Sequence, residues 1–172
     1  MIQAFDRAIT LFDAVFTEED DMLLVTDVHT TSCHDFLKKS PLNVYLKYVK
    51  QKKLLYKLHY DNMLNPYSEE DEKLVTHRFV LSCKTTDIRH RQLLQAICYE
   101  DFAHPTSILK NHQESGYDIY FINLSRNIMY HLYDDRVCDI LAATKETIRF
   151  LYEKYNDWIL EYDRNKIDLT FQ

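Results

Sequence analysis

The stretch from Tyr117 to Leu141 constrains the fold more than any other part of the chain. It consists of three short strand-like runs, residues 117–124, 128–133 and 137–141, separated by two polar turns of three residues. In the first run the side chains alternate in a way that is typical of a strand with two different faces. Because such short connections join antiparallel neighbours, the sequence predicts a three-strand meander.

Helices are expected on both sides of this meander in the sequence. Apolar residues recur at three- and four-residue steps from Ile2 to Phe16, which is typical of an amphipathic helix. After the meander, Thr144 is expected to cap a second helix. Its buried stripe would run from Ile148 to Tyr162 at helical spacing.

The middle of the chain mixes both kinds of element. Strand character is expected at residues 22–28, 54–59 and 74–85, one helix is expected after Pro41, and another is expected after an N-cap at Asp87. The whole order predicts a single α+β domain over residues 1–172. Its sheet would be antiparallel or mixed, with the C-terminal meander as one part and helices packed on one face.

Composition narrows the function classes. The single glycine, Gly116, excludes glycine-rich phosphate-binding loops, so no nucleotide cofactor held in that way is expected. No secretory leader or long apolar run is visible, and the four cysteines form no Cys-x-x-Cys pair, so we expect a cytoplasmic protein with reduced thiols and no membrane contact. The net charge of −6 disfavours nucleic acid and suits a basic protein partner.

Three segments have sequences that resemble an uncharacterised bacterial family known only as a domain of unknown function. These segments are Asp118–Leu124, Met129–Arg136 and Leu151–Arg164. The resemblance extends over most of the chain, but it implies no activity, cofactor or catalytic residue. In that family a glycine follows the Asp-Asp-Arg turn, where this chain has Val137. A β-branched residue disfavours positive φ, so an altered or strained hairpin turn is expected here.

The densest polar constellation is the turn Asp134-Asp135-Arg136, with Asp139 close by. Clustered carboxylates can hold a divalent cation or act as acid and base. Aspartates in turns more often accept hydrogen bonds from nearby backbone, and Arg136 can neutralise one of them. We therefore interpret the cluster as a candidate site for which a structural role is the stronger hypothesis.

Two other groups offer weaker candidate sites. Asp157 and Glu161 would share a helix face beside Trp158, although a solvated acidic face is the simpler interpretation. His29, Cys33 and His34 carry metal-ligating atoms, but their spacing matches no zinc signature. His131 is expected to be a packed residue of the sheet and not a catalytic base. No catalytic residue, metal or cofactor is assigned.

The sequence thus favours a non-catalytic, cytoplasmic protein-binding role of the kind that immunity proteins perform when they neutralise toxins. The acidic runs Glu18–Asp21 and Glu69–Glu72 would suit a basic partner. One alternative is a small metal-dependent hydrolase that uses Asp134, Asp135 and Asp139. A second alternative is nucleic-acid binding through Lys47–Lys53. The sequence disfavours an enzyme and does not fix the oligomeric state.

Overall fold

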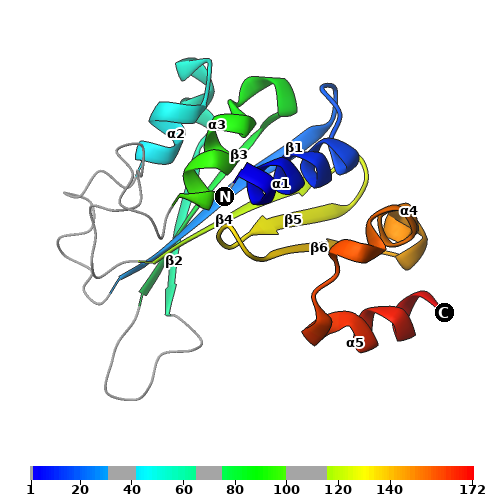
Figure 1. Ribbon diagram of the computed structural model, residues 1–172. Helices are drawn as coiled ribbons and strands as arrows, with labels where there is room; N and C mark the ends of the chain where they lie inside the picture. Colours follow the sequence, from blue (N-terminus) through cyan, green and yellow to red (C-terminus); the bar gives the residue numbers. More distant parts are fainter. Residues whose placement is uncertain (1, 31–41, 65–74, 100–115) are drawn as a thin grey trace.

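A computed structural model describes residues 2–30, 42–64, 75–99 and 116–172. Its centre is a six-stranded sheet in the order β2-β3-β1-β4-β5-β6, in which every pair is antiparallel (Figure 1). The strands are β1 (Asp21–Thr30), β2 (His59–Leu64), β3 (Val75–Lys84), β4 (Gly116–Asn123), β5 (Ile128–Leu132) and β6 (Cys138–Ala142). The predicted α+β class is confirmed, and so is the antiparallel meander, formed by β4, β5 and β6.

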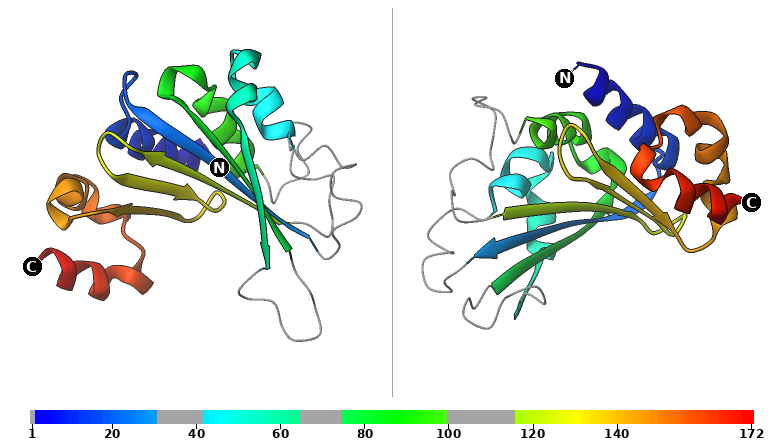
Figure 2. Two further views of the ribbon diagram at one scale, coloured as in Figure 1. Left: turned by 180° about the vertical axis from the view of Figure 1, so that it is seen from behind. Right: turned by 60° about the horizontal axis from the view of Figure 1, so that its bottom comes forward.

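Three helices lie against one face of the sheet (Figures 1 and 2). They are α1 (Ile2–Val15), α2 (Asn43–Tyr48) and α3 (His90–Cys98). The apolar stripe of α1 meets the sheet through Phe12, whose ring packs edge-on against Phe121 of β4. On α2, the buried hydroxyl of Tyr45 donates to the carbonyls of Leu24 and Phe79. We call this side the helix face.

Alternation along β4 separates the helix face from the opposite side of the sheet. Ile119, Phe121 and Asn123 are buried, and they share the helix face. The residues between them, including Tyr120 and Ile122, point to the other side because strand side chains alternate. No helix of the described residues covers that second side, which is seen from behind in Figure 2 (left). We call it the open face.

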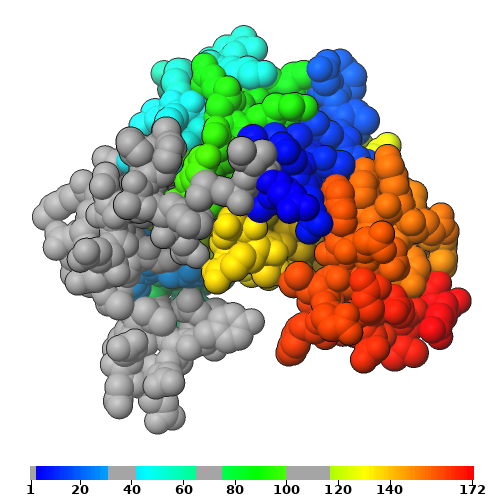
Figure 3. All heavy atoms as spheres, in the orientation of Figure 1, coloured from blue at the N-terminus to red at the C-terminus, as the bar shows by residue number. Residues whose placement is uncertain are grey.

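The C-terminal helix is two helices, which contradicts the expectation of one continuous stripe to Tyr162. The chain forms α4 (Lys145–Tyr155), a 3₁₀ turn η5 (Asn156–Trp158) and α5 (Glu161–Phe171), which make a lobe at the side of the molecule in Figure 3. The guanidinium of Arg164 donates to Asn156 Oδ1 and to the carbonyls of Asn156 and Ile159. These bonds satisfy the carbonyls at the break, and Tyr162 is left 95% exposed.

Two further boundaries differ from the prediction. Residues 54–58 are not a strand, because Lys52–Lys57 form a 3₁₀ helix and β2 begins at His59. Leu55 and Leu58 lie three residues apart and both pack against the core, so the helical spacing outweighed the alternation. Asp87 is not the N-cap of α3: its carboxylate accepts the N–H of Lys84, and the next residue, Ile88, still pairs with Val49 as an isolated bridge.

The expected strain at Val137 is absent. Among the described non-glycine residues, positive φ occurs at Asn127 (56°) and not at Val137. The carbonyl of Val137 closes the hairpin by accepting the N–H of Tyr133 at 3.0 Å, and Asp134 Oδ1 accepts the N–H of Val137 at 3.2 Å. The side chain of Asp134 thus builds a turn that needs no left-handed residue, which is why a β-branched residue fits.

This geometry predicts opposite responses to glycine in the two turns of the meander. Val137→Gly should lower the free energy of unfolding by about 0.5–1 kcal/mol, because glycine adds backbone freedom and gains no favoured φ. Asn127→Gly should leave stability unchanged or raise it slightly, because its φ of 56° suits glycine. Urea unfolding of both variants measures the difference. Stabilisation by Val137→Gly would contradict the unstrained turn.

Candidate functional site: the open face of the sheet

The strand register arranges the open face in cross-strand rows. The ionic row contains Asp61, Arg78, Asp27 and Asp118, from β2, β3, β1 and β4. The next row, which we call the histidine row, contains His59, Val80, Val25, Tyr120, His131 and Asp139. An apolar row follows, with Ser82, Leu23, Ile122, Met129 and Leu141. These side chains share one face because strand residues alternate with a period of two.

A bidentate ion pair lies at the centre of the ionic row. Arg78 Nε donates to Asp27 Oδ1 at 2.8 Å, and Arg78 Nη2 donates to Asp27 Oδ2 at 2.6 Å. The Asp27 carboxylate is buried, with 3% of the residue exposed, whereas the guanidinium reaches solvent. Hydrogen bonding to Asp27 raises the pKa of Arg78. This pair keeps a buried charge compensated and fixes β3 against β1.

Asp118 lies between two histidines. His29 Nε2 is 2.9 Å from Asp118 Oδ2, and His131 Nε2 is 3.4 Å from Asp118 Oδ1. The hydrogen bond to Asp118 raises the pKa of His29, against the effect of burial. The two imidazoles, His131 first and His29 second, hold the pKa of Asp118 well below its usual range. The carboxylate is therefore ionised at neutral pH and favours a proton on His29.

His131 is enclosed by two tyrosine rings, as expected for a packed sheet residue. Its centroid lies 4.2 Å from that of Tyr120 and 4.0 Å from that of Tyr133, and only 4% of the residue is exposed. Within the described part of the chain, its Nε2 has no partner in hydrogen-bond geometry and faces Asp118 at ion-pair distance. The ring thus packs against the two tyrosines with its Nε2 directed at Asp118.

The order hydroxyl, imidazole, carboxylate also occurs in this cluster. Thr76 Oγ1 is 2.9 Å from His29 Nδ1, and His29 Nε2 is 2.9 Å from Asp118. Hydrolase triads share this order, but they also need an accessible nucleophile and donors for an oxyanion. Thr76 is buried in a strand that is paired with β1 and β2 on its two sides, so the surrounding backbone is committed to the sheet. The threonine therefore orients the histidine.

The structure divides the polar cluster that the sequence singled out. Asp134 Oδ1 accepts the N–H of Arg136 at 2.7 Å, and Arg136 Nε donates to Asp134 Oδ2 at 3.0 Å. Although burial acts in the opposite direction, these bonds lower the pKa of Asp134. Asp135 Oδ1 lies farther off, 3.9 Å from Arg136 Nε. These three residues form a turn in which Arg136 compensates Asp134 and one negative charge remains.

Asp139 belongs to the open face and not to that turn. It lies on β6 opposite His131 and accepts the hydroxyl of Tyr133 at 2.9 Å. Burial, together with the hydrogen bond to Asp139, raises the pKa of Tyr133 to about 12. Asp139 therefore extends the carboxylates of the open face toward the outer strand of the meander.

The weaker candidates are also separated. Asp157 lies in η5 and Glu161 begins α5, so the expected shared helix face does not exist; Glu161 instead pairs with Arg164 at 3.6 Å. His29 joins the open face, whereas Cys33 and His34 lie outside the described residues. Within the described ranges, no group of three or more His, Cys, Asp or Glu side chains is arranged to hold a metal ion.

The lysine-rich segment and the first acidic run make local contacts. Within Lys47–Lys53, Lys50 Nζ donates to the carbonyl of Thr86 at 2.7 Å, and Lys52 Nζ donates to the carbonyl of Leu46. In the first acidic run, Asp20 accepts the N–H of Thr17 and the side-chain amide of Asn123, which anchors the end of α1. The second run, Glu69–Glu72, lies outside the described residues.

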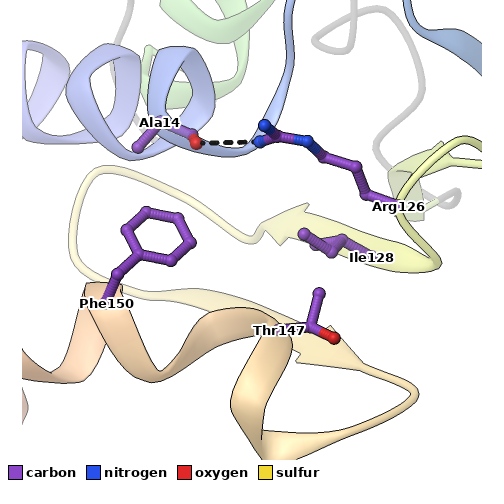
Figure 4. A pocket seen from close by; sticks show the side chains of 5 residues that line it. All are labelled: Ala14, Arg126, Ile128, Thr147 and Phe150. Atoms are coloured by element: carbon purple, nitrogen blue, oxygen red, sulfur yellow. Dashed lines mark hydrogen bonds between the residues drawn. The ribbon is translucent and has the colours of Figure 1, made fainter.

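A hollow of about 510 Å³ lies apart from these rows, between α1, the start of β5 and α4 (Figure 4). Ala14, Arg126, Ile128, Thr147 and Phe150 line it. The Arg126 guanidinium points to the end of α1 and donates to the carbonyl of Ala14 at 3.4 Å. Polar and apolar groups both form its walls, and none of the open-face carboxylates lines it.

The open-face cluster is only partly predictable from the sequence. Asp27, Arg78, Asp118 and Tyr120 were not singled out as a site, because they come from three strands that are far apart in the sequence. One signal was available. Asp27 and His29 alternate with buried residues on a central strand, which is an unusual position for polar side chains.

Removal of the Asp118 carboxylate should lower the pKa of His29. In Asp118→Asn, the histidine loses the hydrogen bond that raises its pKa, and NMR titration of the ring protons measures the shift. Asp21→Asn, at the exposed end of β1, is the matched control and should leave the His29 titration unchanged. An unaltered His29 pKa in Asp118→Asn would contradict the pairing.

The same variant should change stability in a pH-dependent way. The raised pKa of His29 stabilises the fold below its unfolded value of about 6.5, and this contribution is lost as pH rises through the folded pKa. The lowered pKa of Asp118 stabilises above about pH 4, and this contribution is lost at more acidic pH. The loss of folding stability in Asp118→Asn should therefore be largest between about pH 4 and 6.5. At roughly 1 kcal/mol for this partly exposed pair, it is measurable by urea unfolding.

Comparisons with known proteins give a family and no activity. The family "Domain of unknown function (DUF3885)" matches residues 1–163. The chain is also similar to "Uncharacterized protein YnaE" of Bacillus subtilis (strain 168), with 30% identity over 164 residues, which cover 92% of this chain and 74% of that protein. No solved structure matches. Among the described residues, no helix combines the length and the apolar character needed to cross a bilayer.

Proposed function

Since the chain belongs to the DUF3885 family, a domain of unknown function, we propose a role from the geometry of its open face. The open face binds a protein partner with a cationic surface, and the chain acts as a non-catalytic cytoplasmic binding protein of the immunity type. The observation that carries this proposal is a sheet face without a covering helix in the described residues, on which acidic, aromatic and apolar side chains lie together.

Charge supports a cationic partner. The ionic and histidine rows contain four carboxylates, Asp27, Asp61, Asp118 and Asp139, against one arginine, Arg78. With neutral histidines the two rows therefore carry a formal charge of −3, in the same direction as the net charge of −6 for the whole chain. Complementary charge raises association rates and selects among partners.

Apolar and aromatic side chains on the same face supply contact area. Leu141 in the apolar row is 58% exposed, and Tyr133 beside Asp139 is also exposed. Tyrosine is enriched at protein interfaces because its ring is large and its hydroxyl can remain hydrogen-bonded. The apolar row lies next to the histidine row, so one partner surface can contact both.

Mutual pairing of the polar groups supports binding over catalysis. Asp27 is held by Arg78, Asp134 by Arg136, and Asp139 by Tyr133. A neutralising protein needs a preformed complementary surface and no turnover, which fits such a self-satisfied arrangement. The hydrolase alternative would need Asp139 beside Asp134 and Asp135, and these residues make separate contacts here.

Affinity capture from a lysate of the native host tests the proposal. The open-face variant Asp139→Arg/Leu141→Arg reverses a charge and disrupts the apolar row. Glu153→Arg/Leu169→Arg makes the same two changes on exposed positions of α4 and α5. A protein retained by the wild type and by the control but lost by the open-face variant would support the proposal. Identical retention by all three chains would contradict it.

The immunity role also predicts that the captured protein is toxic. When expressed alone, that protein should arrest growth, and co-expression of the wild-type chain should restore it. The open-face variant Asp139→Arg/Leu141→Arg should fail to restore growth, whereas the control variant should succeed. A captured protein without toxicity would retain the binding role and remove the immunity role.

A further inference from the structure

The edge strand β2 presents an exposed surface that includes large apolar side chains. It pairs with β3 on one side and is the last strand of the described sheet on the other (Figure 1). All six of its residues are exposed, among them Tyr60, Met63 and Leu64, the last of which is 71% exposed. An exposed edge of this kind is a template for pairing with another strand.

The backbone of β2 is oriented for such pairing. The N–H of Asn62 donates to the side chain of Asp61 at 2.8 Å and is therefore directed away from β3. In antiparallel strands, alternate residues direct both backbone groups to the same side. The backbone groups of Tyr60 and Leu64 consequently point outward together with those of Asn62, and they can bond to a new strand without disturbing the pairing of β2 with β3.

We propose that β2 pairs antiparallel with β2 of a second copy of this chain, with Asn62 at the two-fold axis. The dimer joins two sheets into one continuous sheet, which keeps the helices of both copies on the same side and extends the open face. This inference does not rest on the proposed partner binding, because it uses the outer backbone edge of β2, whereas partner binding uses the open face of the sheet.

Side-chain alternation and charge select the register. A two-fold axis perpendicular to the sheet pairs only residues that lie on the same face. Two registers then pair five of the six residues of β2, and they are centred on Asp61 and on Asn62. The first would place the two Asp61 carboxylates opposite each other, which is destabilising. The second places Tyr60 opposite Leu64 and Asp61 opposite Met63, with no opposed like charges.

The contact between Asp61 and Asn62 does not prevent the dimer. Asp61 must release the N–H of Asn62 so that this N–H can donate across the axis. A replacement partner is present, because Asp61 lies directly opposite Arg78 in the register of β2 and β3. The guanidinium of Arg78 is partly exposed, and the charge of Asp61 already acts on it. The released carboxylate therefore keeps a favourable charge partner.

Sedimentation equilibrium of the purified chain tests the proposal directly. The wild type should show a concentration-dependent dimer. Asn62→Pro should be monomeric at the same concentrations, because proline lacks the N–H that crosses the axis and tolerates an edge position. Circular dichroism checks that the variant retains its fold. A wild type that stays monomeric up to about 1 mM, or an Asn62→Pro variant that dimerises like the wild type, would overturn the proposal.

A second variant tests the register and does not depend on the folding of the proline variant. Met63→Lys places an ammonium opposite Asp61 of the other copy twice per dimer, so the dissociation constant should fall by about three- to tenfold. Leu169→Lys adds the same charge at an exposed site on α5 and should have a smaller effect or none. An equal or weaker dimer for Met63→Lys would overturn the register.

Disulfide cross-linking locates the axis. In the proposed register the two Asn62 Cα atoms are about 5.5 Å apart, within the range that a disulfide spans. Asn62→Cys should therefore form a covalent dimer under mild oxidation, with the wild-type chain as the background. Asp61→Cys lies off the axis and should cross-link more slowly. Faster cross-linking at position 61 than at position 62 would overturn the placement of the axis.

Discussion

Phe12→Ala is expected to lower the free energy of unfolding by about 4 kcal/mol, since a fully buried aromatic ring is replaced by a cavity. Phe12 is fully buried, and its ring lies at the junction of α1, α3 and the meander. Its aromatic neighbours are Phe16, His90, Phe121 and Tyr130, with centroids at 4.4, 4.9, 5.1 and 5.5 Å. Neighbouring rings of this size cannot collapse into the space, so most of the cavity should persist.

Urea unfolding followed by circular dichroism measures this loss. Leu169→Ala is the control, because Leu169 is 72% exposed and its truncation should change stability by less than about 0.5 kcal/mol. Phe12→Leu should fall between the two, because it retains most of the buried volume. If Phe12→Ala cost no more than Leu169→Ala, the packing of α1 on the meander described here would be wrong.

Arg78→Met is expected to cost about 3 kcal/mol, because it leaves the buried Asp27 carboxylate without its charge partner. Asp27 is 3% exposed, and both of its oxygens accept hydrogen bonds from Arg78. Methionine keeps the length and most of the apolar stem of arginine, so the loss reports on charge more than on packing. Thermal or urea unfolding at neutral pH measures the change.

The double variant Asp27→Asn/Arg78→Met separates two energies. One is the stabilisation by the ion pair, and the other is the destabilisation caused by an unpaired buried charge. It should recover most of the stability that Arg78→Met loses, because no buried charge then remains. The four chains of this cycle give the coupling energy between the two side chains. A double variant no more stable than Arg78→Met would indicate that Arg78 acts mainly through other contacts.

The meander is the clearest case in which the sequence was sufficient to predict the fold. Its turns are short, its strands alternate, and these local features are also the ones that antiparallel pairing requires. The same alternation separated the two faces of β4, and the tertiary structure decided which of them is buried. Local patterns failed where two periods competed, as at residues 54–58, and where tertiary contacts ended an element, as Arg164 does between α4 and α5.

The candidate site shows more clearly that closeness in sequence does not predict which polar residues meet in the fold. Asp134, Asp135 and Asp139 are close in sequence, and their proximity suggested one cluster. In the fold, Asp134 closes a turn while Asp139 faces across the sheet. Conversely, His29 and Asp118 are 89 residues apart in sequence and yet share a hydrogen bond.

The sequence by itself determined the α+β class, the first helix, the central strands and the antiparallel meander. Each depends on the spacing of apolar side chains and on short connections, which act over a few residues. Only the tertiary structure decided which polar residues meet, because β1, β3 and β4 become neighbours through a register that long connections leave unspecified. That register brings Asp27 to Arg78 and His29 to Asp118, and it leaves the edge of β2 exposed.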